Sequence, residues 1–149
     1  MINMEFTIRV ANSKDIVDLL ELEKEAHSEI SWWKKQTKKE FLHSMSVSKY
    51  NVMVAIHNGK VVGYVQGELN IRGYGRFKSL FLENIYVLKK YRRRGVARLL
   101  VQMFTAYWCK KRKYVELMTT KKNRKIFEKL GFKWTMVYMI IGSTQKKVK

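Results

Sequence analysis

The stretch that decides the fold is Glu83–Leu100, which reads ENIYVLKKYRRRGVARLL. It begins inside the apolar run Leu80–Val87, which is typical of a buried strand, and from Gly95 to Lys113 apolar residues recur at helical spacing. The first amides of a helix lack internal acceptors and lie at the positive end of its dipole. A strand, a basic turn and a helix start therefore predict an anion site, and Gly95 lets the backbone approach a pyrophosphate closely.

Three consecutive arginines in this turn support the same expectation. Arg92, Arg93 and Arg94 can give charge-assisted hydrogen bonds to phosphate oxygens, and Ala97 keeps a second position of the helix start small. A basic helix start on a solvated surface would show the same pattern. The turn by itself leaves both interpretations open.

The net charge of +19 is unevenly spread along the chain. Residues 1–31 contain 3 Lys/Arg and 7 Asp/Glu, whereas residues 32–149 contain 28 and 5. The larger part is basic enough to attract a polyanion, either nucleic acid or a phosphorylated cofactor. A merely solvating surface charge is the alternative, and charge does not choose between them.

The composition of the 149 residues excludes several classes of protein. A hydrophobic content of 46% without low-complexity tracts predicts one folded domain rather than disorder. No apolar run approaches the roughly 20 residues that span a bilayer, and no signal-peptide pattern is present. The single cysteine, Cys109, favours a reducing, cytoplasmic location. The histidines His27, His43 and His57 lack metal-ligand spacing, so we expect no metal.

Hydrophobic periodicity predicts the other elements of the chain. Asn12 and Asp15 are spaced for a capping box, and Asn58-Gly59 between two β-rich runs predicts a hairpin with a type I′ turn. The predicted strands are Glu5–Val10, Val52–Ile56, Val61–Leu69, Tyr114–Thr120 and Phe132–Ile141, and the predicted helices are Lys14–Ile30, a short one within Ser31–Ser48, and Asn123–Leu130. This order predicts a single α/β or α+β domain, residues 1–149, whose mixed sheet has helices on both faces.

Two helical faces carry further expectations. In the first helix the acidic residues are expected to face solvent: Asp18, Glu21, Glu25 and Glu29. In the helix from Gly95 the expected buried stripe is Val96, Leu99, Leu100, Met103 and Tyr107.

Two motifs give the chain a family resemblance. Arg92-x-x-Gly95-x-Ala97, placed after the strand Leu82–Val87, resembles the Arg/Gln-x-x-Gly-x-Gly/Ala signature of the GNAT superfamily of N-acetyltransferases. Asn123–Phe132, an Asn-led helix that ends in Gly-Phe, resembles the family's later segment, and the order of elements agrees along nearly the whole chain. The sequence has neither the dinucleotide fingerprint G-x-G-x-x-G nor a P-loop. The resemblance implies a mixed, mostly antiparallel sheet of six to seven strands.

The same resemblance implies acetyl-CoA as the co-substrate. The family splays its fourth and fifth strands apart around the cofactor, and here those strands would be Leu80–Val87 and Tyr114–Thr120. The pantetheine arm would hydrogen-bond to strand backbone, and the pyrophosphate would bind the amides that open the helix. The implied cofactor-binding residues are Ile85, Tyr86, Val87, Arg92, Arg93, Arg94, Gly95, Val96, Ala97, Arg98, Asn123 and Phe127.

Glu83 is the candidate general base. It is an acidic residue in an apolar strand of the basic part of the chain, and desolvating a carboxylate is costly without a partner. It could take a proton from the acceptor amine or anchor a cationic amine, directly or through water. A structural ion pair with Lys or Arg is an equal alternative.

The general acid that the family would lead us to expect is missing. Its usual tyrosine, which protonates the CoA thiolate, is replaced here by Phe127. A thiol with a pKa of about 8.5 can leave without full protonation, so transfer need not be abolished. Tyr138 on the last predicted strand could substitute, although packing is its simpler role.

These residues predict an enzyme that transfers acetyl from acetyl-CoA to a primary amine directly within a ternary complex. The acceptor could be a protein N-terminus, a lysine, a polyamine or a small amine metabolite. The alternative is a basic nucleic-acid-associated protein on the same scaffold with little or no catalysis, although no recognised nucleic-acid motif is present. Trp32 and Trp33 could line an acceptor site, or belong to the core or a homodimer surface. Cys109 is expected to be an inert packing residue.

Overall fold

The computed structural model describes residues 5–47, 50–72, 77–108 and 114–135. The chain divides between Thr119 and Thr120 into two compact units, and each is described by itself. The expectation of a single domain over residues 1–149 stays a prediction.

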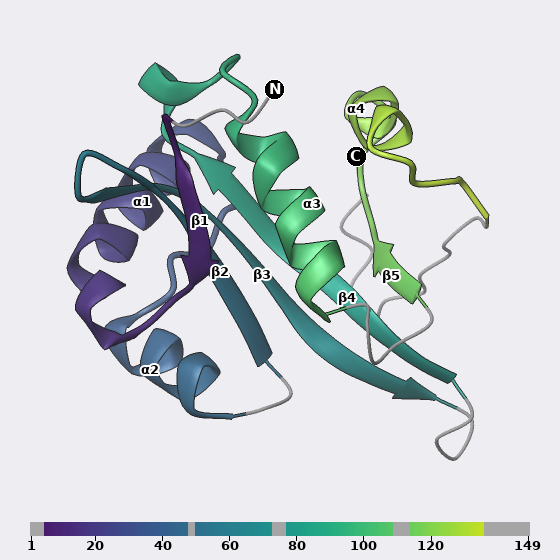
Figure 1. The fold of residues 1–149 in the computed structure, drawn as a ribbon, viewed down its shortest axis with the longest axis horizontal. Helices are drawn as coiled ribbons and strands as arrows, with labels where there is room; N and C mark the ends of the chain where they lie inside the picture. The colour runs from purple at the N-terminus through teal and green to yellow at the C-terminus, as the bar shows by residue number, and fades with distance from the viewer. Residues whose placement is uncertain (1–4, 48–49, 73–76, 109–113, 136–149) are drawn as a thin grey trace. The chain divides into compact units, whose positions relative to one another are not determined.

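The first unit is built on a sheet of five strands in the order β1-β2-β3-β4-β5 (Figure 1). The strands are β1 (Thr7–Val10), β2 (Tyr50–His57), β3 (Lys60–Arg72), β4 (Phe77–Val87) and β5 (Tyr114–Leu117). Strands β1 to β4 pair antiparallel, and β5 runs parallel to β4. The predicted mixed, mostly antiparallel sheet is confirmed.

The number of strands differs from the expected six to seven, because the described part of the chain contains five. Of the predicted last strand Phe132–Ile141, residues 132–135 form no strand, and the remainder lies outside the described residues. Apolar, β-branched composition indicates that a segment suits a pleated surface, but a strand also needs a neighbour to pair with. Composition therefore predicted a strand at residues 132–135, where the structure has none.

The hairpin between β2 and β3 is the one that the sequence predicts. Its two turn residues, Asn58 and Gly59, have φ angles of +48° and +77°. Positive φ at both central positions is the requirement of a type I′ turn, which matches the twist of the flanking strands. The predicted capping box is also confirmed: the Asn12 amide donates to Asp15 Oδ2 at 2.8 Å at the start of the first helical segment, Ser13–Asp15.

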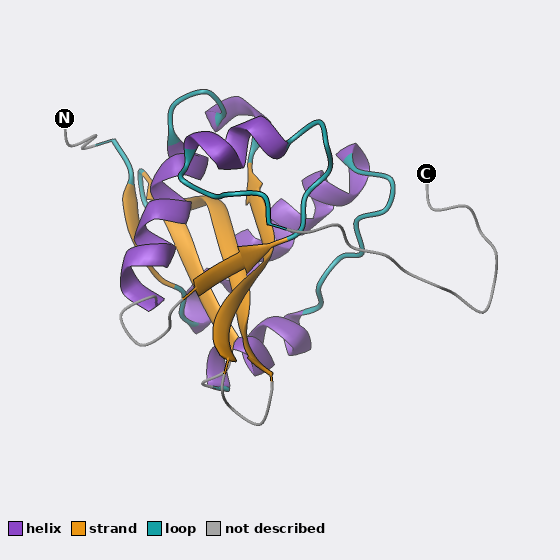
Figure 2. Cartoon of the chain, turned by 90° about the vertical axis from the view of Figure 1, so that its right-hand side faces the viewer, coloured by secondary structure: helices purple, strands orange, loops and turns teal. Residues whose placement is uncertain are grey.

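Helices cover both faces of the sheet, as expected (Figure 2). On one face lie α1 (Ile16–Glu29) and α2 (Lys38–Ser46), which bury Tyr64 of β3 and Tyr86 of β4. On the other lies α3 (Val96–Trp108). Helix α3 packs so closely that a Cβ at Gly67 would lie 2.6 Å from Cζ of Phe104. A glycine at this point of β3 therefore lets the helix approach the sheet.

The buried stripe of α3 is rotated from the predicted one. Its buried residues are Val96, Leu100, Val101 and Phe104, whereas Met103 and Tyr107 are exposed. Apolar residues lie almost all round this helix, so periodicity alone could not select the face that meets the sheet.

The acidic face of α1 is not simply turned to solvent, which corrects the sequence expectation. Asp18 accepts a hydrogen bond from the Val61 amide at 3.0 Å, and Glu25 accepts one from the Lys89 amide at 2.8 Å. Glu29 binds a guanidinium that belongs to the segment after β4. Only an element remote in sequence supplies these donors, so a helical pattern cannot reveal them.

The second unit contains α4 (Arg124–Lys129). Asn123 is its N-cap residue, although its side chain makes no capping hydrogen bond. After the helix Gly131 has a φ of +95°, the left-handed conformation expected of a helix-ending glycine. Phe127 and Phe132 pack edge to face with ring centroids 5.9 Å apart.

Candidate functional site

Strand β4 is paired on both sides along only part of its length. Strand β5 pairs with Ser79–Leu82, whereas Asn84–Val87 pair with β3 alone among the described strands. Each strand residue carries one backbone donor and one acceptor, and on the β5 side of that segment the Val87 carbonyl accepts a hydrogen bond from Arg92 Nε at 2.9 Å. Strand β5 ends at Leu117, opposite Leu82, so the expected splay of these two strands stays a prediction.

Glu83 directly follows Leu82, the last residue of β4 that pairs with β5. The pairing of β4 with β3 shifts there, because Gln66 faces Asn84 and Gly67 faces Leu82, which leaves Glu83 without an opposite residue. This is a β-bulge, a feature that re-aims a side chain. The Glu83 side chain is exposed and lines a pocket.

The turn after β4 has the geometry of an anion site. It continues through a short 3-10 segment, Lys89–Tyr91, and then places Arg93 and Gly95 at φ angles of +63° and +80°. Turns of alternating handedness direct backbone amides to one side, which suits an anion. The Gly95 carbonyl accepts the first α3 bond from Leu99 at 3.0 Å, so the amides of residues 96–98 have no acceptor within the helix.

Arg92 is turned toward α1. Its two terminal nitrogens each donate to a Glu29 oxygen at 2.6 Å, and its Nε donates to the Val87 carbonyl at 2.9 Å. The hydrogen bonds from Arg92, which outweigh the effect of burial, lower the pKa of Glu29 to about 2. Arg94 pairs with Glu5 at 2.9 Å. Side chains of this turn thus fix it to other elements of the first unit.

Tyr86 of β4 is also bound to α1. Its hydroxyl donates to Glu29 at 2.7 Å and approaches Glu25 at 3.2 Å. Burial, the hydrogen bond to Glu29 and the two nearby carboxylates raise the pKa of the Tyr86 phenol. Its side chain is therefore structural and neutral, and its backbone faces β3, where Tyr86 lies opposite Tyr64.

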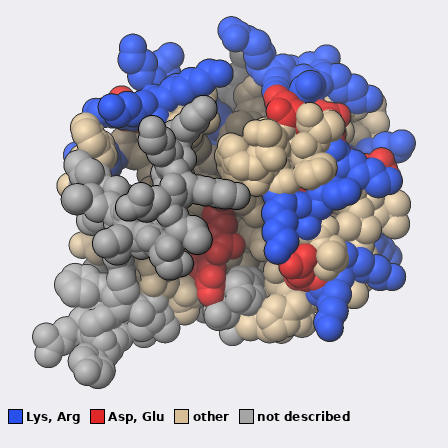
Figure 3. All heavy atoms as spheres, turned by 180° about the vertical axis from the view of Figure 1, so that it is seen from behind, with Lys and Arg blue, Asp and Glu red and all other residues tan. Residues whose placement is uncertain are grey.

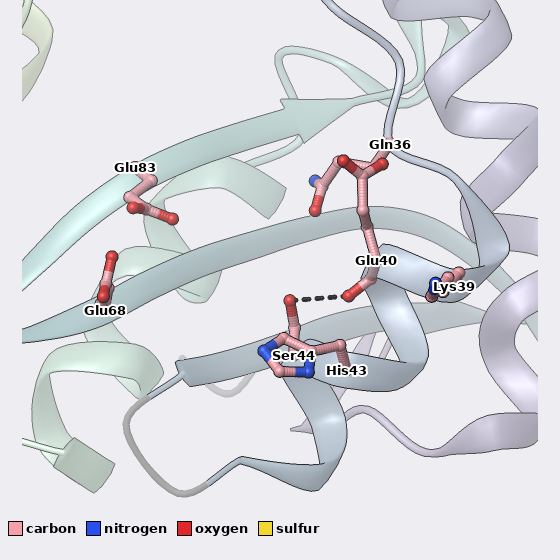
Figure 4. Close-up of a pocket in the computed structure, with 7 residues that line it drawn as sticks. All are labelled: Gln36, Lys39, Glu40, His43, Ser44, Glu68 and Glu83. Atoms are coloured by element: carbon pink, nitrogen blue, oxygen red, sulfur yellow. Dashed lines mark hydrogen bonds between the residues drawn. The ribbon is translucent and has the colours of Figure 1, made fainter.

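A pocket of about 430 Å³ opens next to Glu83 (Figure 4). It is lined by Gln36, Lys39, Glu40, His43, Ser44, Glu68 and Glu83. The carboxylates of Glu68 and Glu83 point toward one another from neighbouring strands. Residues from the loop before α2, from α2 itself, from β3 and from β4 thus meet at one place.

The pocket is acidic in a basic part of the chain. Three of the five acidic residues beyond position 31, Glu40, Glu68 and Glu83, line it. Glu40 also accepts a hydrogen bond from the Thr37 amide at 2.7 Å, which lowers the pKa of its carboxyl. On the face that Figure 3 shows, Lys and Arg cover a large part of the surface, and acidic atoms occupy small patches. Such a pocket favours a cation.

The sequence singled out Glu83 but missed Glu40 and Glu68. Carboxylates are rare after residue 31, and this rarity, which drew attention to Glu83, marks Glu40 and Glu68 equally. What the sequence could not show is that α2 and β3 bring them to Glu83.

The other predicted site residues are distributed as follows. Trp33 is buried, while Trp32 is 76% exposed. Asn123 and Phe127 belong to the second unit, and Tyr138 and Cys109 lie outside the described residues. Within the described ranges there is no group of three His, Cys, Asp or Glu that could hold a metal ion. Over the same ranges, no helix has the length and apolar character needed to cross a bilayer.

Comparison with known proteins identifies the family. Residues 48–134 match the acetyltransferase (GNAT) domain, so the chain belongs to the GNAT family of acetyltransferases. Comparison with curated protein sequences gave no match. The family membership confirms the resemblance seen in the two motifs.

Solved structures with the same fold include three acetyltransferases. An aminoglycoside acetyltransferase from an uncultured soil metagenomic sample, in complex with sisomicin, is 15% identical with a TM-score of 0.75, over 97% of this chain and 100% of that one. AAC(6')-Iy, in complex with a bisubstrate analogue of CoA and acetylneamine, is 20% identical with a TM-score of 0.76, over 93% and 98%. Glucosamine-6-phosphate N-acetyltransferase from Arabidopsis thaliana is 19% identical with a TM-score of 0.75, over 93% and 99%.

Proposed function

We propose that this protein transfers an acetyl group from acetyl-CoA to a primary amine of a cationic acceptor. The observation that carries the proposal is the arrangement along β4. A basic turn follows one end of the segment Glu83–Val87, and an acidic pocket opens at the other. An anionic cofactor and a cationic acceptor could therefore meet beside the bulge.

The cofactor would bind mainly through backbone groups. The amides of residues 93–98 would hold the pyrophosphate, with help from the exposed Arg93 and Arg98, and Ile85 and Val87 would pair with the pantetheine arm. Arg92 would act through the turn it fixes, since its donors already bind Glu29 and the Val87 carbonyl. The roles of Asn123 and Phe127 stay predictions.

Glu83 would serve as the general base in direct transfer within a ternary complex. The acceptor arrives as an ammonium, and Glu83 takes its proton, directly or through water. The amine nitrogen then forms a bond to the thioester carbonyl carbon, the C–S bond breaks, and the electron pair leaves with the CoA sulfur. The second proton of the attacking nitrogen passes through solvent to the departing thiolate, which leaves a neutral amide and a CoA thiol. Because CoA is a thiol with a pKa of about 8.5, its thiolate is an adequate leaving group.

The pocket narrows the class of acceptor. Glu68 and Glu40 add negative charge beyond the one carboxylate that a base would need, which favours an acceptor with more than one ammonium group. Polyamines and amino sugars fit this description, whereas a lysine or an N-terminus would need a basic sequence around it. A cytoplasmic location and a homodimer stay predictions.

Thermal stabilisation tests the cofactor site against the nucleic-acid alternative. The melting temperature would be measured with acetyl-CoA, desulfo-CoA, ATP and a DNA duplex, at low and moderate salt. A specific CoA site raises it by mass action, and the effect persists at moderate salt. Stabilisation by DNA alone, with a steep salt dependence, would sink the enzyme proposal.

Glu83→Gln tests the base. We expect kcat for acetylation of spermidine to fall by about 100-fold, because general base catalysis typically contributes that much. Acetyl-CoA affinity should stay unchanged. Glu21→Gln is the control, since Glu21 lies exposed on α1 and pairs only with Lys24 in the described structure. An unchanged pH–rate profile in Glu83→Gln would remove Glu83 from the mechanism.

Phe127→Tyr tests the missing general acid. We expect its activity to stay within tenfold of the wild type or to improve, because a thiolate can leave unprotonated. Steady-state turnover of acetyl-CoA at saturating spermidine would measure this. A large loss would show instead that Phe127 shapes the acyl-binding region.

A further inference from the structure

A carboxylate is buried in the middle of α1. Glu23 is 1% exposed, and its oxygens accept three hydrogen bonds from neutral donors. The Tyr64 hydroxyl donates to Oε1 at 2.5 Å, while Trp33 Nε1 and the Gln36 amide donate to Oε2 at 3.1 Å and 2.7 Å. Burying an ionisable carboxyl group among neutral partners is costly, and apolar residues of similar volume often stabilise a core equally well.

The hydrogen bonds continue from Glu23 to the acidic pocket. Gln36, whose backbone binds Glu23, donates from Nε2 to Gln66 Oε1 at 2.8 Å. Gln66 in turn donates from Nε2 to Ser44 Oγ at 3.2 Å. Both Gln36 and Ser44 line the pocket, although Glu23 itself does not.

The same contacts fix the segment that enters α2. Trp33 and Gln36 lie in the loop before α2, and Thr37 follows as the N-cap of that helix. The Thr37 hydroxyl accepts a hydrogen bond from the Glu40 amide at 3.2 Å. Glu23 Oε2 thus holds Trp33 and Gln36, the residue directly before the Thr37 cap of α2, with one oxygen. The position of Glu40 in the pocket follows from the same anchor.

We propose that Glu23 is a positioning residue for the acceptor, which acts by holding Gln36 and the start of α2 in the geometry that forms the pocket. The proposal rests on the proposed function, since it assigns the pocket to a cationic amine. It also explains why a carboxylate occupies this buried position. One acceptor oxygen, rather than an apolar side chain, can hold an indole and a backbone amide together.

Asp15 provides a matched control. It is also buried, at 4% exposure, and it holds the Arg9 guanidinium with contacts of 2.7 Å and 2.8 Å. Although burial alone would raise the pKa of Asp15, hydrogen bonds from Arg9 and the Asn12 amide lower it. Neither Asp15 nor Arg9 lines the pocket. Its loss should therefore affect stability without affecting the acceptor.

Calorimetric binding of spermidine and of acetyl-CoA to Glu23→Gln and Asp15→Asn tests the proposal. Gln keeps the shape of the side chain, but one oxygen becomes a donor that faces Tyr64 or the two N–H groups. We expect spermidine affinity to fall about tenfold in Glu23→Gln and to stay within twofold in Asp15→Asn. Acetyl-CoA affinity should stay within twofold in both variants.

Gln36→Ala shows whether Glu23 affects spermidine affinity through Gln36. It also tests the proposal if Glu23→Gln does not fold. Alone it should weaken spermidine binding several-fold, and combined with Glu23→Gln it should add little, because coupled residues are non-additive. Unchanged spermidine affinity in folded Glu23→Gln, or in Gln36→Ala, would overturn the proposal. So would a wild type that does not bind spermidine.

Failure of the proposed function gives a different result. A wild type that binds spermidine and acetyl-CoA but forms no acetylated amine would contradict acetyl transfer to this acceptor. The positioning role of Glu23 would then still be supported by the selective loss of spermidine affinity.

Discussion

The two ends of the segment Glu83–Val87 differ in charge and in construction. The turn that follows it, Arg92–Arg98, is basic and is made of consecutive residues. The pocket beside Glu83 is acidic and is assembled from a loop, α2, β3 and β4. The difference teaches that a site for a common cofactor can be local in sequence, whereas a site for a particular acceptor is built from distant segments.

Both ends are attached to the same helix. Glu29, near the end of α1, binds Arg92 of the turn, and Glu23, two turns earlier, binds Trp33, Gln36 and Tyr64 near the pocket. Helix α1 thus sets the position of the basic turn and the acidic pocket relative to one sheet. Changes in these two glutamates should have separable effects on the two ligands.

Among the further variants that compare the two ends, the largest effect is expected in the turn. Gly95→Ala forces a Cβ onto a left-handed residue, and this conformation costs about 1–2 kcal/mol. We therefore expect acetyl-CoA affinity, measured by calorimetry, to fall by roughly 5- to 30-fold. Gly59→Ala is the matched control: its φ is +77° against +80°, and in neither case would the Cβ meet an atom within 4 Å. Equal losses of acetyl-CoA affinity in the two variants would contradict a cofactor role for the turn.

The charges of the pocket should have smaller effects on KM for spermidine, and these effects should be opposite in sign for an acidic and a basic residue. Glu68→Gln should raise KM for spermidine about fivefold, and Lys39→Gln should lower it about twofold. Glu68 is half-buried and Lys39 is exposed, and charge interactions at solvent-accessible sites contribute about 1 kcal/mol or less. Steady-state kinetics would measure both, with KM for acetyl-CoA unchanged. Added salt should shrink both differences. Shifts of the same sign would argue against an electrostatic pocket.

The smallest effect concerns the attachment of the turn to α1. Glu29→Gln should lower the free energy of unfolding at pH 7 by about 1 kcal/mol. This small value is expected because solvent screens a partly exposed ion pair. Because folding depresses the pKa of Glu29 from 4.5 to about 2, its stabilisation is present above about pH 4.5 and is lost as the pH falls toward 2. Urea unfolding should therefore show wild type and variant converging over this interval. A difference in the free energy of unfolding that does not change with pH would exclude the Glu29–Arg92 ion pair as the cause of the difference.

Much of the fold could be predicted because its signals are local. The Asn58-Gly59 turn and the Asn12–Asp15 capping box depend on residues within one turn of each other, and both are confirmed. The buried face of α3 was predicted correctly at Val96 and Leu100 but wrongly at Met103 and Tyr107. The solvent-facing role of the α1 carboxylates was also wrong, because both features depend on which element packs against the helix.

The sequence by itself determined the family and the basic turn. The order strand, Arg92-x-x-Gly95-x-Ala97 and helix is contiguous, and the conformational freedom of glycine and the unpaired amides of a helix start are properties of the local chain. A short motif can therefore carry that part of the site.

Only the tertiary structure decided the pocket and the two attachments of α1. Arg92 is 63 positions from Glu29, and Tyr64 is 41 positions from Glu23, so no periodicity relates them. They meet because the sheet brings β3 and β4 beneath α1, and because buried polar groups must find partners once water is excluded. The same packing gathers Glu40, Glu68 and Glu83 around one pocket in a strongly basic chain.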